Sequence, residues 1–93
     1  MYNDLYLRGI FKTVVENGVR KSTFKILGVA SLDKRINKLH MFRHELVNKM
    51  FIISPQNNSN LREYFLLDRN EKVLGKIKKS SSKSGWWEFN SFR

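Results

Sequence analysis

The sequence contains no cysteine, a single proline and no long apolar run, since the longest one extends only from Met50 to Ile53. The absence of cysteine excludes disulfides and thiolate metal sites, and it favours a reducing compartment. A membrane-spanning helix needs about 20 apolar residues, so no such helix is predicted. The first residues lack the basic start and apolar stretch of a signal peptide. We therefore expect a cytoplasmic protein that does not contact a membrane.

Acidic residues are also scarce compared with basic ones. The chain carries 18 Lys and Arg against 8 Asp and Glu, a formal net charge of +10. A positive balance this large on a small chain favours a polyanionic partner, usually nucleic acid. The alternative is a soluble protein that is merely basic. Nine asparagines and few alanines are typical of an AT-rich genome, such as that of a virus or phage.

The residues that are present suffice for one compact domain. The chain has 93 residues, of which 41% are hydrophobic and 13% aromatic. This is enough apolar surface for a folded core but too short a chain for two independent cores. We expect one small basic domain over residues 1–93.

A helix is predicted from Ser31 to Ile53. Ser31 and Asp33 suit its first turn, and Pro55 would end it. Apolar residues recur at the three- and four-residue spacing of a buried helix face, namely Leu32, Ile36, Leu39, Leu46, Val47 and Met50, with Phe42 at the edge. One flank would be cationic, with Lys34, Arg35, Lys38 and Lys49. A solvated helix surface is the alternative reading of that flank.

Leu5 to Ala30 predicts a β-hairpin. Its turn would be Asn17-Gly18, a pair that tolerates the positive φ angles of a type I′ turn. That turn makes Phe11 the partner of Phe24, on the face turned to the core. The opposite face would be cationic and includes Arg8, Lys12, Lys21 and Lys25. It binds an anion or is an ordinary solvated sheet face.

Three further strands are predicted over residues 62–68, 72–79 and 85–92, although residues 62–67 also fit a short helix. The turns would be residues 69–71 and the serine stretch 80–84. The predicted fold class is therefore α+β: a mostly antiparallel sheet in the order β-β-α-β-β-β, with a single amphipathic helix packed across one face.

The carboxy-terminal third most resembles a nucleic-acid-binding segment. Lys72, Lys76, Lys78, Lys79 and Lys83 follow one another without an acid between Glu71 and Glu88. Lysines neutralise phosphates, and an aromatic ring can stack on an unpaired base. Because neighbouring residues of a strand face opposite ways, we assign Trp87 and Phe89 to the core and Trp86 to the surface. Trp86 would stack on a base, cover a protein interface or be purely structural.

Metal binding and catalysis have weaker support. His40 and His44 would lie one helical turn apart, which suits a metal, but no third ligand is marked. We expect no metal and no cofactor. A small basic ribonuclease using His40, His44, Glu63 and Tyr64 is a third-ranked alternative.

The sequence thus predicts a non-enzymatic protein that binds RNA, or less favourably DNA, mainly through phosphate contacts. The runner-up is a small inhibitor or accessory protein that docks on a nucleic-acid-handling enzyme. The oligomeric state is not predicted. The predicted nucleic-acid-binding residues are Arg8, Lys12, Lys21, Lys25, Lys34, Lys38, Lys76, Lys78, Lys79, Lys83 and Trp86.

Overall fold

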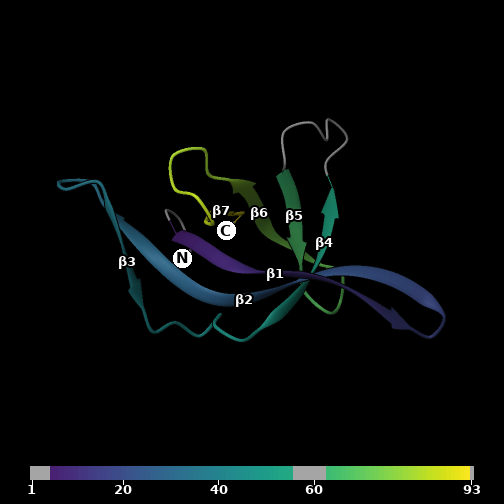
Figure 1. Cartoon of the computed structure of the whole chain (residues 1–93). Helices are drawn as coiled ribbons and strands as arrows, with labels where there is room; N and C mark the ends of the chain where they lie inside the picture. Colours follow the sequence, from purple (N-terminus) through teal and green to yellow (C-terminus); the bar gives the residue numbers. More distant parts are fainter. Residues whose placement is uncertain (1–4, 56–62, 93) are drawn as a thin grey trace.

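The chain folds into β-strands, as shown by a computed structural model that describes residues 5–55 and 63–92 (Figure 1). The strands are β1 (Leu5–Glu16), β2 (Val19–Asp33), β3 (Lys38–Phe42), β4 (Met50–Pro55), β5 (Glu63–Leu67), β6 (Val73–Lys79) and β7 (Trp87–Ser91). The described residues include no helix, and so none that is long and apolar enough to cross a membrane. The predicted α+β class is wrong: the fold is all-β.

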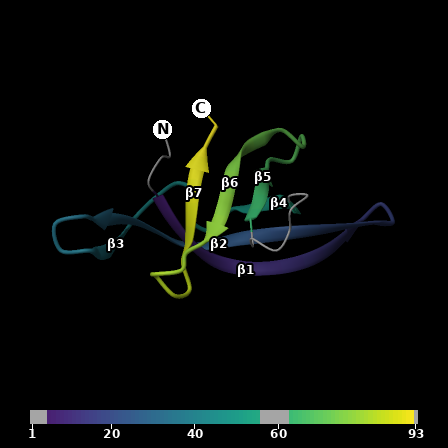
Figure 2. The same ribbon diagram turned by 90° about the horizontal axis from the view of Figure 1, so that it is seen from above.

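The strands form a closed antiparallel barrel. The order around it is β1-β7-β6-β5-β4-β2, and pairing of β2 with β1 closes the ring, while β3 lies outside on β2. Seen from above, β6 and β7 cross over the long, curved β1 and β2 (Figure 2). The β1–β2 hairpin projects beyond the barrel at one end, and the β2–β3 turn projects at the other (Figure 1).

The predicted hairpin is confirmed with its register. Asn17 and Gly18 have φ angles of 51° and 78°, and Phe11 pairs with Phe24. The register shifts once, between Arg8 and Gly9. Beyond that shift Leu7 is buried in the core, whereas Phe11 and Val15, on the turn side of the shift, are exposed.

The predicted helix over residues 31–53 is replaced by the end of β2, strand β3, a loop and the start of β4. Asp33 does not lie in a first helical turn; its Oδ1 accepts a hydrogen bond from the backbone N of Arg35 at 3.0 Å. The turn ends at Asn37, with a φ of 52°, and Asn48 has a φ of 70°. Two left-handed residues interrupt the segment, which is incompatible with a continuous right-handed helix.

The apolar residues of the predicted helix therefore do not share one buried face. Leu46 is buried, whereas Ile36 is 55% exposed and Met50 is 44% exposed. Leu39 is half-buried where β3 pairs with β2. Lys34 and Arg35 lie in the turn and Lys38 in β3, so the predicted cationic helix flank does not exist.

The three carboxy-terminal strands are confirmed as a meander, with β5 paired to β6 and β6 to β7. The turn after β5 is held by Asp68, whose Oδ1 accepts hydrogen bonds from the backbone N atoms of Asn70 and Lys72. The core assignment of Trp87 and Phe89 is also confirmed, since both are buried. The barrel core consists of Leu7, Phe24, Ile26, Val29, Leu46, Ile53, Leu66, Ile77, Trp87 and Phe89.

Candidate nucleic-acid interface

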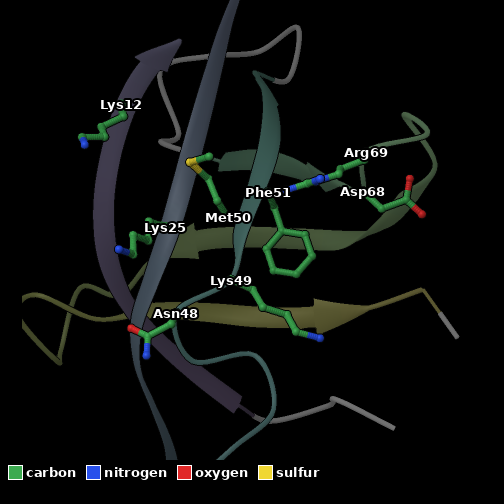
Figure 3. A pocket seen from close by; sticks show the side chains of 8 residues that line it. All are labelled: Lys12, Lys25, Asn48, Lys49, Met50, Phe51, Asp68 and Arg69. Atoms are coloured by element: carbon green, nitrogen blue, oxygen red, sulfur yellow. The ribbon is translucent and has the colours of Figure 1, made fainter.

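Basic side chains gather on the outer surface of the barrel where the hairpin leaves it. Lys12, Lys21 and Lys25 share one face of the hairpin, because their strand positions alternate with Phe11 and Phe24. Lys49, just before β4, and Arg69, in the turn after β5, lie beside them (Figure 3). We call these residues the cationic face: Lys12, Lys21, Lys25, Lys49 and Arg69.

Two grooves run along the cationic face. The larger has a volume of about 640 Å³ and is lined by four of its basic residues, together with Asn48, Met50, Phe51 and Asp68. In Figure 3 the ammonium groups of Lys12 and Lys25 extend to the same side from neighbouring strands. The second groove, of about 370 Å³, adjoins the first through Met50, Phe51 and Arg69 and is lined by Lys21.

The charge of this face is largely uncompensated. Across residues 5–55 and 63–92, no side chain of the cationic face forms an ion pair or hydrogen bond. The acids that line the grooves are Asp68 and Glu16. Asp68 is already engaged by the backbone of its own turn. The potential at this surface is therefore positive, which attracts a polyanion.

Other predicted binding residues are engaged elsewhere. Lys76 forms an ion pair with Glu63 at 3.7 Å. The Nζ of Lys83 donates to the backbone O of Asn37 at 2.6 Å, which connects the β6–β7 loop to the β2–β3 turn. Lys34 and Lys38 are exposed in and beside that same turn. These residues do not join the cationic face.

The lysines at the end of β6 point in different directions. Lys78 is exposed on the same side of β6 as Lys76, whereas Lys79 lies on the opposite side. The Nζ of Lys79 lies 5.4 Å from the ring centroid of Trp87. The structure therefore divides the acid-free lysine run between two surfaces.

Arg8 and Trp86, both predicted to bind nucleic acid, contact each other. The guanidinium carbon of Arg8 lies 5.2 Å from the ring centroid of Trp86. An Nη of Arg8 also donates to the Sδ of Met41 at 3.7 Å. Trp86 is half-buried, so it is less accessible than the predicted surface position requires.

An aromatic cluster closes the end of the barrel beneath the hairpin. The ring of Phe11 lies 4.9 Å from that of Phe24, 5.6 Å from Tyr64 and 5.3 Å from Trp87, between centroids. Phe24 and Trp87 are buried, but Phe11 remains 44% exposed. Sequence reasoning assigned Phe11 to the core and missed this accessible ring, because alternation gives the facing of a residue but not where a barrel ends.

The two histidines do not have the helical spacing predicted for a metal site. His40 lies in β3 and His44 in the following loop, not one helical turn apart. The part of the chain that the structure describes contains no cluster of three or more His, Asp or Glu. Nδ1 of His44 accepts a hydrogen bond from the backbone N of Leu46 at 3.1 Å. Burial, followed by the charge of Lys49, lowers the pKa of His44.

Comparison with known proteins gives no assignment. No family model, no curated protein and no solved structure matches the chain.

Proposed function

We propose that this protein binds nucleic acid, without catalysing a reaction, through phosphate contacts made by the cationic face. The observation that carries the proposal is the group of five basic side chains around two adjoining grooves, none with a partner among the described residues. Basic side chains that neutralise phosphates release counterions, and this release drives binding. The net charge of +10 would guide the encounter over a longer range.

An unpaired strand, with RNA as the favoured form, fits this surface better than a duplex. Base reading in the major groove of a duplex uses an α-helix or a two-stranded β-ribbon, and of these the described residues offer only the β1–β2 ribbon. Sequence-specific recognition of RNA mostly targets single-stranded bases that stack on aromatic side chains. Here an exposed ring, Phe11, precedes Lys12 in β1, and both residues line one cleft.

Salt dependence tests the electrostatic mechanism. Fluorescence anisotropy would follow binding of a labelled single-stranded RNA, and of a matched duplex, across a salt series. The affinity should fall by about 0.7 log units per tenfold rise in salt for each phosphate contacted on a single strand. The variant Lys12→Ala, Lys25→Ala, Arg69→Ala should flatten this slope by about 2 units if each residue meets one phosphate.

A control variant has the same net charge as this triple variant but leaves the cationic face intact. Lys34→Ala, Lys38→Ala, Lys78→Ala removes the same charge from exposed positions elsewhere. It should leave the slope close to that of the wild type. Equal slopes in the two variants would reject the cationic face as the site, and no binding by the wild type at low salt would reject nucleic-acid binding.

A protein partner is the second candidate, and the free edge of β1 favours it. β1 pairs with β7 only from Leu5 to Leu7, so within the described chain its outer edge is unpaired from Arg8 onward. Ile10 and Val15 of this segment are exposed. Unpaired strand edges accept an added strand from another chain. Co-purification with a stoichiometric protein that survives nuclease and high salt would favour this candidate.

The ribonuclease alternative gains no such support. Glu63 and Tyr64 are neighbours in β5, so their side chains point to opposite sides of the barrel wall. The carboxylate of Glu63 pairs with Lys76, and the ring of Tyr64 contacts Phe11 and Trp87. A labelled RNA that stays intact on incubation with the protein would count against catalysis.

A further inference from the structure

A cleft opens between the inner face of the hairpin and strands β4 and β5. It has a volume of about 380 Å³ and is lined by Phe11, Lys12, Thr13, Ser22, Ile53 and Tyr64. Small-molecule sites in proteins commonly start at about 300 Å³, so the volume is large enough for a planar heterocycle. Its lining combines exposed aromatic surface with hydroxyl groups, which differs from the lysine-rich grooves outside.

From this cleft we infer that the protein holds one unpaired nucleobase, stacked on Phe11 at the end of the barrel beneath the hairpin. The inference rests on the proposed function, because the base would belong to the strand bound along the cationic face. The inference requires that the bound strand contain at least one unpaired base.

The ring of Phe11 is both accessible and held in place. One side of the residue is packed by Phe24, Tyr64 and Trp87, at centroid distances between 4.9 and 5.6 Å. The remaining 44% of the residue is exposed. A ring that is already immobilised loses little conformational entropy when a base stacks on it, so stacking is favoured here.

Polar groups lie where the edge of a stacked base would be. Thr13 and Ser22 are cross-strand partners on the same face as Phe11, two pairs farther toward the turn. Tyr64 contributes a third hydroxyl from β5. In the described ranges, none of these three hydroxyls makes a side-chain hydrogen bond. A hydroxyl both donates and accepts, so the set can satisfy more than one kind of base.

The cleft and the cationic face are adjacent rather than separate. Lys12 lines both the cleft and the larger cationic groove. A strand with phosphates at Lys12 and Lys25 would therefore reach the cleft by turning one base over the free edge of β1. A phosphate or a lipid headgroup has no planar ring to stack on the aromatic wall, whereas a base is recognised by stacking and hydrogen bonding.

Phe11→Leu tests the inference, because leucine keeps apolar contact but removes the aromatic ring. The matched control is Phe42→Leu, a ring 42% exposed on β3 and outside the barrel. The probe is an oligouridine with one central 2-aminopurine, whose fluorescence falls when it stacks. Phe11→Leu should weaken single-strand binding at least about fivefold and abolish the fluorescence change, without altering the salt slope. Phe11→Tyr should restore both, and Phe42→Leu should change neither.

The outcomes separate this inference from the proposed function. A thermal melt first establishes that each variant is folded. If folded Phe11→Leu binds and quenches the probe like the wild type, while the Lys12, Lys25, Arg69 variant still loses salt dependence, the base site is wrong and the proposed function stands. If Phe11→Leu weakens single strand and duplex alike, the ring does not hold a base, and the inference is also wrong. If the wild type binds no nucleic acid at low salt, both proposals fail.

Discussion

The guanidinium of Arg8 lies 5.2 Å from the ring centroid of Trp86, which joins β1 to the loop that precedes β7. The same guanidinium donates to Met41 in β3. One side chain thus connects three segments on the outer surface. Trp86 is engaged by the protein itself, so its accessible surface is smaller than that of a free stacking platform.

This contact predicts an energetic coupling between the two residues. In a double-mutant cycle with Arg8→Ala and Trp86→Ala, the coupling free energy of unfolding should be about 0.5–1 kcal/mol, the range for an exposed cation–π pair. Urea unfolding of the four proteins measures it. Trp86→Ala should also leave single-stranded RNA affinity within about twofold, whereas a loss comparable to one stacked base, about 1–3 kcal/mol, would place the base on Trp86 instead of Phe11.

The barrel predicts which leucine of residues 31–53 matters for stability. Leu46 is 7% exposed and belongs to the core, whereas Leu39 is half-buried outside the barrel on β3. Leu46→Ala should lower the free energy of unfolding by about 2–5 kcal/mol, the range for a cavity in a packed core. Leu39→Ala should cost clearly less. The reverse order in chemical denaturation would contradict the strand assignment.

Local chemistry made the hairpin predictable. Asn17-Gly18 specifies a two-residue turn almost by itself, and the turn then fixes every pair along the strands, including Phe11 with Phe24. The inward facing of Trp87 and Phe89 followed from alternation in the same way. Both inferences needed only neighbours in the sequence, and both are confirmed.

The helix was predicted wrongly because the same spacing of apolar residues also arises when two strands pair across a short turn. The three- and four-residue spacing of Leu32, Ile36 and Leu39 resembles a helix, yet Leu32 and Leu39 are partners across the β2–β3 hairpin. Turn signals were present in Asn37 and Asn48, residue types that tolerate a positive φ. The sequence did not show which signal prevails, since closure of the barrel decides it.

The candidate site was predictable only in part. Lys12, Lys21 and Lys25 were placed on one face by the hairpin register. Lys49 and Arg69 were missed, because they meet that face only after β4 pairs with β2 and the β5–β6 turn returns beside it. Contacts between residues far apart in the chain depend on the strand topology, and no local sequence pattern predicts them.

The β1–β2 turn predicts a strong dependence on residue type at position 18. Gly18 has a φ of 78° and open space around it, so the backbone conformation is the constraint on substitution. Gly18→Val should destabilise the fold by roughly 1–2 kcal/mol, because a β-branched residue resists a positive φ. Gly18→Asn should cost less. Similar urea midpoints for the two variants would show that the turn does not restrict φ.

Acid should weaken the fold through His44. Burial and the neighbouring charge of Lys49 lower its pKa below the ordinary value of 6.5. The unfolded chain then binds a proton more readily than the folded one, so the stability that neutral His44 contributes is fully present above pH 6.5 and is lost as the pH drops below that value. Protonation of Nδ1 would also remove the acceptor for the backbone N of Leu46.

Urea unfolding between pH 5 and pH 8, at about half-unit steps, measures this dependence above the range where carboxylates of ordinary pKa, about 4, titrate. His44→Asn should flatten the curve, because an amide oxygen can replace Nδ1 as acceptor and does not titrate in this window. His40→Asn, at the exposed histidine of β3, is the matched control and should keep the wild-type profile. If His40→Asn abolishes the acid sensitivity and His44→Asn preserves it, the proton that destabilises the fold binds in β3, and burial beside Leu46 is not the cause.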